Sequence, residues 1–181
     1  MRVTGGVLKG MQFPPGFASH VRPSTDRVRE SLFNQLVHRY DLNGINVLDL
    51  FSGSGIIAAE FFSRGVECVK SIDLDFKNVS YQNERKRERE ELENWQITKH
   101  DVFKWIKKDD KKYDIIFADP PYGMPDLNVF PLKVASMLKD DGILVFEHQP
   151  NLSFSIPFDY QKEYGSTTIS IFVESQIKNG K

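Results

Sequence analysis

Three short, mainly apolar segments constrain the fold of this 181-residue chain more than any other feature. Residues 45–50, 113–118 and 142–147 each have the pattern of a buried strand, and helical patterns lie between them. Strands that are apolar on both faces are typical of parallel sheets covered by helices on both sides. The alternation of such strands with helices therefore predicts an α/β fold with a mainly parallel sheet.

The remaining segments extend this alternation. We predict helices at residues 25–39, 55–64, 76–93, 102–108 and 127–139, and further strands at residues 66–74 and 95–98. A turn at Gly5 and Gly6 predicts a small β-hairpin within residues 1–13, and residues 160–164 and 167–174 predict a terminal antiparallel hairpin. We expect two units: the hairpin and helix of residues 1–40, packed on a main domain of residues 41–181.

Composition excludes several classes of protein. The single cysteine, Cys68, allows neither an intrachain disulfide nor a thiolate metal cluster, and the four histidines lack metal-ligand spacing, so we expect no metal. No apolar run approaches the roughly 20 residues of a membrane helix. Residues 1–10 lack the apolar stretch of a secretory signal, so we expect a cytoplasmic protein.

Positive charge gathers at the start of the chain. The whole chain has a net charge of -1. The basic residues of the first 40 positions are Arg2, Lys9, Arg22, Arg27, Arg29 and Arg39, and the acidic ones are Asp26 and Glu30. This excess predicts a local contact with a polyanion, although chance clustering in a short segment is an equal alternative.

A glycine-rich turn follows the first buried strand. The sequence DLFSGSG at residues 49–55 includes Phe51, Ser52, Gly53 and Gly55, and a predicted helix begins at its end. Two glycines let the backbone approach a ligand closely, and the helix N-terminus offers free N–H groups. Asp73 stands 20 positions after Gly53, where a carboxylate can accept hydrogen bonds from ribose hydroxyls. The spacing predicts an adenosine-containing cofactor.

Two features favour S-adenosylmethionine over a dinucleotide. The carboxylate of Asp49, four residues before Gly53, repels a pyrophosphate but suits a ligand with a cationic sulfonium and ammonium. No second mononucleotide-binding half is evident. Asp101 and Val102 follow the strand at residues 95–98, where the acid can accept from an adenine amine, cap the helix, or do both. The loose G-x-G-x-x-A pattern keeps a nicotinamide-dependent oxidoreductase as an alternative.

The tetrapeptide Asp119-Pro120-Pro121-Tyr122 follows the strand at residues 113–118. Two prolines turn the backbone out of the sheet at its ligand-binding edge. The Asp119 carboxylate and the Pro120 carbonyl can each accept one hydrogen of an exocyclic amine, and Tyr122 can stack on the base. Holding both hydrogens aims the nitrogen lone pair at a methyl donor. We predict these three residues to be catalytic, although the tetrapeptide does not distinguish a guanine from an adenine amine.

Together, the glycine turn and the tetrapeptide resemble the class I S-adenosylmethionine-dependent methyltransferases. The sequences RVTGG at residues 2–6 and RPSTDRVRE at residues 22–30 are similar, more narrowly, to the RsmD family of 16S ribosomal RNA guanine-N2 methyltransferases. The resemblance runs from residue 2 to about residue 173. It implies a seven-stranded Rossmann-like sheet with a reversed last strand. It also implies a cofactor pocket lined by Thr25, Asp49, Gly53, Gly55, Asp73, Asp101 and Asp119.

The resemblance further implies methyl transfer to the N2 amine of a guanine in 16S rRNA, held by Asp119, Pro120 and Tyr122. The expected substrate is a small ribosomal subunit or an assembly intermediate, with no obligate protein partner. Arg2, Lys9 and Arg22 are then the candidate phosphate contacts. An adenine-N6 methyltransferase acting on DNA or RNA is the nearest alternative, and a catalytically silent ribosome-assembly module is another.

Overall fold

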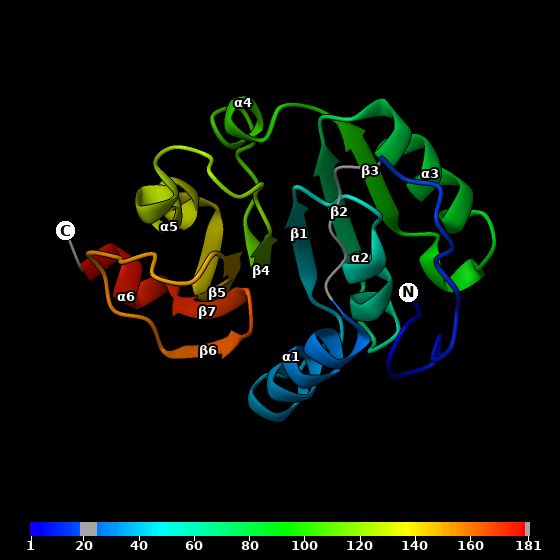
Figure 1. Ribbon diagram of the computed structural model, residues 1–181, viewed down its shortest axis with the longest axis horizontal. Helices are drawn as coiled ribbons and strands as arrows, with labels where there is room; N and C mark the ends of the chain where they lie inside the picture. Colours follow the sequence, from blue (N-terminus) through cyan, green and yellow to red (C-terminus); the bar gives the residue numbers. More distant parts are fainter. Residues whose placement is uncertain (19–24, 180–181) are drawn as a thin grey trace.

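The computed structural model describes residues 1–18 and 25–179. Their centre is a 7-stranded sheet with the order β3-β2-β1-β4-β5-β7-β6 (Figure 1). The strands are β1 (Asn46–Leu50), β2 (Cys68–Asp73), β3 (Trp95–Lys99), β4 (Tyr113–Ala118), β5 (Leu138–His148), β6 (Tyr160–Tyr164) and β7 (Thr167–Val173). Strands β1 to β5 are parallel, whereas β7 runs antiparallel to both β5 and β6. The predicted fold class, including the reversed strand, is confirmed.

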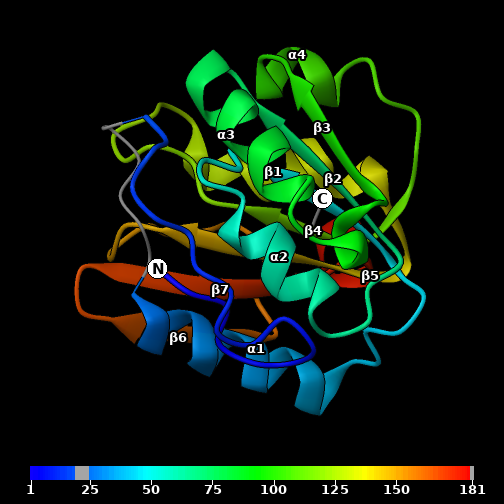
Figure 2. The same ribbon diagram turned by 90° about the vertical axis from the view of Figure 1, so that its right-hand side faces the viewer.

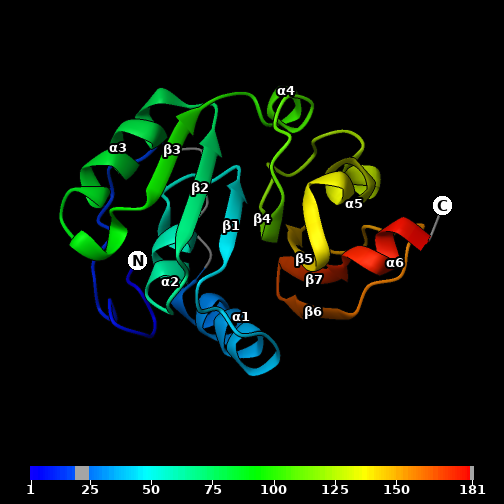
Figure 3. The same ribbon diagram turned by 180° about the vertical axis from the view of Figure 1, so that it is seen from behind.

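Helices cover both faces of this sheet. They are α1 (Asp26–Arg39), α2 (Ile56–Phe62), α3 (Phe76–Lys86), α4 (Val102–Ile106), α5 (Phe130–Val134) and α6 (Glu174–Asn179). Residues of α1, α2 and the N-terminal segment share one buried apolar cluster with Val47 of β1, whereas α4, α5 and α6 share a second cluster with Leu48. Figures 1 and 3 show these two groups of helices on opposite sides. The alternation of side chains along each strand thus builds two cores.

The N-terminal segment, residues 1–18, lies beside α2 (Figures 1 and 2). Its predicted hairpin contains one antiparallel bridge between Arg2 and Gln12, flanked by backbone hydrogen bonds from the Val3 amide to the Met11 carbonyl at 3.0 Å and from the Phe13 amide to the Met1 carbonyl at 2.8 Å. Residues between the two arms bond to Ser63, which follows α2: the Val7 amide donates to the Ser63 carbonyl at 2.8 Å, and the Leu8 amide donates to the Ser63 hydroxyl at 2.8 Å. The amides of the connecting residues therefore attach this segment to the main body.

Several element boundaries differ from the predictions. The charged helix predicted to end at residue 93 ends at Lys86, because a 3₁₀ turn (Glu90–Leu92) buries Leu92 and leads the chain into β3. The helix predicted at residues 127–139 is replaced by α5 flanked by the short 3₁₀ turns Leu127–Val129 and Ala135–Met137. It stops there because Leu138 already pairs with Tyr113 in the sheet. Helix α6 was not predicted.

Two further observations concern only residues 1–18 and 25–179. No helix in them has the length and apolar character needed to cross a bilayer. Nor do they bring together three His, Cys, Asp or Glu side chains in a way that could hold a metal ion.

Candidate functional site

A cavity of about 820 Å³ opens at the carboxyl ends of β1, β2, β4 and β5. Its walls come from the start of α1, the glycine turn, the β2–α3 connection, the start of α4, the Asp119–Tyr122 tetrapeptide and the β6–β7 turn. The predicted site residues in these walls are Thr25, Phe51, Gly53, Asp73, Asp101, Val102, Asp119, Pro120 and Tyr122. Segments far apart in the sequence therefore meet at one edge of the sheet, as parallel strands require.

Asp73 holds the glycine turn in place. Its Oδ2 accepts a hydrogen bond from the Gly53 amide at 2.7 Å, and its Oδ1 accepts from the Asp75 amide at 2.8 Å and from the Asn78 side chain at 3.1 Å. Each carboxylate oxygen has about two acceptor sites, so Oδ2 retains one for a ligand hydroxyl. Asp73 thus holds the turn and lines the cavity where the ribose contact is predicted.

We expect Asp73→Ala to weaken the binding of S-adenosylmethionine and S-adenosylhomocysteine alike by about tenfold or more, because it removes a charged acceptor worth about 1.5–3 kcal/mol. Isothermal titration calorimetry measures this. Asn78→Ala is the matched control, since it removes one donor to Asp73 but keeps the carboxylate, and it should lose less affinity. Unchanged affinity of Asp73→Ala would remove this residue from the site.

Phe51 adopts the left-handed conformation, with φ of 59°, directly after β1. Such a conformation costs a non-glycine residue on the order of 1 kcal/mol or more. Its ring is fixed by edge-on contact with Phe103 at 6.1 Å and by contact with Phe130 at 6.0 Å between ring centres. Phe51 and Phe103 line the cavity and form an apolar part of its wall, with the buried Phe130 behind them.

Three residues predicted to bind the cofactor lie behind the cavity wall. Gly55 has φ of +76°, and a Cβ there would overlap the Trp95 ring, so this glycine is required for packing. Ser52 is buried, and its hydroxyl accepts a hydrogen bond from Gln82 at 2.9 Å. Asp49 is 1% exposed. These three residues, which the sequence pattern predicted to contact the ligand, therefore pack behind the glycine turn and are absent from the cavity lining.

The buried position of Asp49 changes its acidity. The Ser71 hydroxyl donates a hydrogen bond to Asp49 Oδ2 at 3.1 Å, and the Trp95 indole donates to that hydroxyl at 2.8 Å. Burial nevertheless dominates and raises the pKa of Asp49 to about 8, with a smaller contribution from the nearby charge of Asp73. The ionised form is therefore costly unless a cationic ligand lies near it.

This shift makes a pH-dependent prediction for the unliganded protein. When folding raises the pKa of an acid, protonation of that acid favours the folded state. This contribution is fully present at pH values below the pKa of the unfolded state, and it is lost as the pH rises toward the pKa of the folded state. Asp49→Asn should therefore be more stable than the unsubstituted protein at pH 8, by up to about 1.4 kcal/mol for each pH unit above about 4. Urea unfolding at pH 5 and pH 8 measures the difference. An equal difference at both values would contradict the shift.

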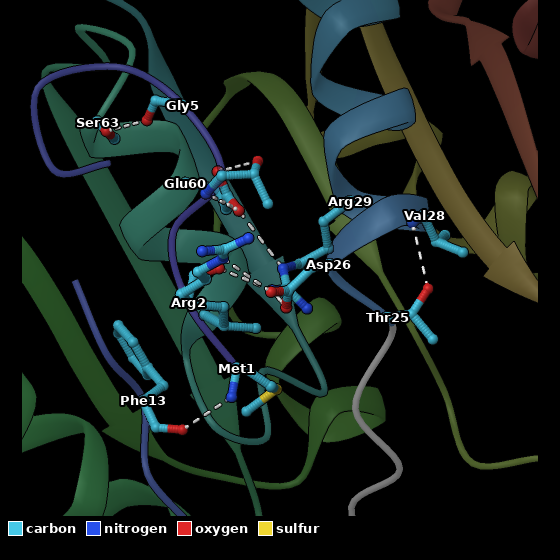
Figure 4. A network of polar contacts seen from close by, with 12 residues as sticks. Met1, Arg2, Gly5, Phe13, Thr25, Asp26, Val28, Arg29, Glu60 and Ser63 are labelled. Carbon is cyan, nitrogen blue, oxygen red and sulfur yellow. Dashed lines mark hydrogen bonds and ion pairs between the residues drawn. The ribbon is translucent and has the colours of Figure 1, made fainter. Parts of the chain in front are cut away.

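Asp101 and Thr25 each combine a cavity wall with a helix cap. The Asp101 carboxylate accepts a hydrogen bond from the Lys104 amide at 2.9 Å at the start of α4, and the Thr25 hydroxyl accepts from the Val28 amide at 3.3 Å at the start of α1 (Figure 4). Both residues also line the cavity. The two alternatives for Asp101, cap and ligand contact, are therefore compatible.

The tetrapeptide lies where β4 ends. Asp119 faces the cavity, Pro120 is buried, and Tyr122 is 44% exposed, with its hydroxyl donating to the Ser166 carbonyl at 3.3 Å. Burial raises the pKa of Asp119 well above its usual range, and the charges of Glu147 and Asp49 raise it further. A carboxyl, a carbonyl and an exposed aromatic face thus lie together at the cavity.

Sequence reasoning missed three polar residues of the site. Asn78 orients Asp73, and Glu147 and Thr167 line the cavity beside Asp119. Glu147 carries a signal that was available: it ends a buried apolar strand, as Asp73 does. The other two carry none, because Asn78 on α3 and Thr167 at the start of β7 reach the site only through the tertiary fold.

The candidate phosphate contacts lie in different environments. Arg2 is 63% exposed but forms an ion pair with Asp26 at 3.2 Å (Figure 4). Lys9 is exposed in the turn of the N-terminal segment. Arg22 lies outside the described residues. Lys9 is therefore the cleaner position for testing a contact with a polyanion.

A family model described as Conserved hypothetical protein 95 matches residues 1–173. The chain belongs to this family. The Ribosomal RNA small subunit methyltransferase D of Buchnera aphidicola from Acyrthosiphon pisum is 30% identical over 86% of this chain and 81% of its own length. The Escherichia coli K12 protein of the same name is 27% identical over 99% of this chain and 77% of its own. The resemblance to the RsmD family is confirmed.

A solved structure shares the fold. A hypothetical protein of Thermus thermophilus superposes with a TM-score of 0.81 at 25% identity, covering 95% of this chain and 98% of its own. The similarity covers nearly the whole of both chains, so the fold as a whole is shared.

Proposed function

We propose that the protein transfers a methyl group from S-adenosylmethionine to the exocyclic N2 amine of a guanine in small-subunit ribosomal RNA, in the cytoplasm. The observation that carries the proposal is the meeting of Asp119, Pro120 and Tyr122 with the glycine turn and Asp73 in one cavity. A cofactor bound along the turn and a base stacked on Tyr122 would then share one space. The names of the relatives favour rRNA as the substrate.

The charges of the cavity fit the proposed cofactor. Its described lining includes Asp73, Asp75, Asp101, Asp119 and Glu147 and contains no lysine or arginine. Such a lining favours a ligand with a sulfonium and an ammonium group and disfavours the pyrophosphate of a dinucleotide. The acidic lining therefore disfavours a nicotinamide-dependent oxidoreductase, and it outweighs the loose glycine pattern that supports one.

The chain's own residues bind and orient both substrates. When bound, S-adenosylmethionine supplies an electrophilic methyl group. Asp73 and the Gly53 turn hold its ribose, with Asp101 near the base. Asp119 and the Pro120 carbonyl accept the two hydrogens of the target amine, which directs the nitrogen lone pair toward the methyl donor. The amine becomes acidic only once the new bond forms, so Asp119 accepts the proton late.

Small ribosomal subunits from cells lacking this protein provide the decisive substrate. We expect tritiated methyl groups to be transferred to these subunits, and the same assay on naked 16S RNA shows whether the assembled particle is required. Mass spectrometry of the digested product should then identify N2-methylguanosine. N6-methyladenosine would establish the adenine alternative instead. Absence of transfer to both RNAs, with intact S-adenosylmethionine binding by calorimetry, would favour the assembly module.

The basic N-terminal segment is the proposed RNA contact. Neutralising Arg2 and Lys9 together should weaken RNA binding and reduce its salt dependence by about two charges, because each phosphate contact releases a counterion. Filter binding across a range of salt concentrations measures the slope, and cofactor affinity should stay unchanged. Since Arg2 also pairs with Asp26, Lys9→Gln alone is the control for structural damage. A constant slope would exclude these residues as phosphate contacts.

A further inference from the structure

Glu147 is a second carboxylate at the position proposed for the target base. Strands β4 and β5 are parallel neighbours, with Ala118 paired to Phe146. Asp119 and Glu147 are the next residues along each strand, so they occupy equivalent positions on strands about 4.8 Å apart. Both line the cavity. The sheet register therefore places two carboxylates side by side on one cavity wall.

The two carboxylates present acceptors to the cavity. The Thr167 hydroxyl donates a hydrogen bond to Glu147 Oε1 at 3.1 Å, whereas Oε2 has no donor within residues 1–18 and 25–179. Glu147 is 6% exposed, and it lines the cavity. The Asp119 carboxylate likewise receives no hydrogen bond from the described part of the chain. A ligand that offers adjacent N–H donors would satisfy both.

The surroundings distinguish the two acids. Burial raises the pKa of both carboxyls, but the Thr167 hydrogen bond and the positive charge of Arg29 act against this rise at Glu147. For Asp119, the neighbouring charges of Glu147 and Asp49 only add to the rise. Glu147 is therefore the member of the pair that is better supported as an ionised acceptor.

The two purines differ at the edge that this pair would meet. Guanine presents N1–H beside its N2 amine, so it offers donors at adjacent positions. Adenine presents its N6 amine beside an N1 lone pair, which a carboxylate repels. Resting on the proposed function, we infer that Glu147 determines specificity by accepting the guanine N1–H while Asp119 and the Pro120 carbonyl hold the N2 amine. The tetrapeptide alone does not make this distinction, whereas the second carboxylate does.

The test uses small subunits reconstituted with 16S rRNA that carries either guanine or 2-aminopurine at the methylated position, which is first located by mass spectrometry of fragments of the methylated rRNA. 2-Aminopurine keeps the N2 amine but has an acceptor at N1. We expect the unsubstituted protein to methylate guanine about 100-fold faster in single turnover, because a site built around a hydrogen bond rejects an analogue that lacks it. In Glu147→Gln, the amide can donate to the N1 acceptor, so this preference should fall to below about tenfold.

Glu163→Gln is the matched control, because it makes the same chemical change at an exposed position on β6 and should keep the 100-fold preference. A Glu147→Gln variant that is folded by circular dichroism and keeps the full preference would overturn the inference. The unsubstituted protein gives a second test that needs no variant: equal rates on guanine and 2-aminopurine would also overturn it. If the proposed function is wrong, the guanine substrate itself is not methylated. If only the role of Glu147 is wrong, guanine is methylated but the preference over 2-aminopurine does not depend on Glu147.

Discussion

Replacing Asp119 by alanine should lower the single-turnover rate of methyl transfer by about 10²–10³-fold, the usual loss when one preorganised electrostatic contact is removed. The carboxylate lies at the cavity wall and receives no hydrogen bond from the described residues, so it is available to the target amine. The glycine turn is held by Asp73 and stays intact. Affinity for S-adenosylmethionine should therefore change little, and the defect should persist when both substrates are saturating.

Tyr122 provides the contrast that tests this assignment. Tyr122→Ala should weaken productive binding of the base by about 1–3 kcal/mol, because it removes a stacking surface. Tyr122→Phe keeps the ring and loses the 3.3 Å hydrogen bond to the Ser166 carbonyl, so it should be nearly silent. If Asp119→Ala transfers methyl groups at the original rate, or if Tyr122→Phe is as damaged as Tyr122→Ala, the amine is held in another way.

Parallel strands and the turns that follow them were predictable because their signals are local. The runs around Val47, Ile116 and Leu144 are apolar on both faces, and the structure buries each of these side chains. The carboxyl ends of such strands meet at one edge whatever the connecting helices do. Asp73 and Asp119 could therefore be placed in one cavity from the sequence alone.

Other features depend on contacts between distant segments. Gly55 matched a ligand-binding pattern, but its lack of a side chain is required by Trp95, which lies 40 positions later in the chain. Leu138 was assigned to a helix by its local pattern, and its pairing with Tyr113 overrides that preference. The acidic character of Glu147 was visible, but its partnership with Asp119 follows only from the order of strands in the sheet.

The attachment of the N-terminal segment depends on Glu60, a charged residue inside the apolar helix α2. Glu60 is 0% exposed, and its carboxylate accepts from the Thr4 amide at 2.9 Å, the Thr4 hydroxyl at 3.0 Å and Arg64 at 2.5 Å. Arg29 of α1, which is 1% exposed, approaches Glu60 at 3.4 Å (Figure 4). One carboxylate thus links α2 to both the N-terminal segment and α1.

Glu60→Ala should lower the free energy of unfolding by about 3–5 kcal/mol, because removing the central carboxylate of a buried network leaves the charge of Arg64 unbalanced and the Thr4 donors unsatisfied, although Arg29 keeps its ion pair with Asp26 at 2.7 Å. Chemical denaturation measures this. Glu84→Ala is the matched control, since Glu84 is exposed on α3 and its loss should stay within about 0.5 kcal/mol. Because α1 carries Thr25 and Val28 into the cavity wall, cofactor affinity should fall with stability in Glu60→Ala. A loss below about 1 kcal/mol would show that apolar packing alone, around residues such as Phe33, holds these segments together.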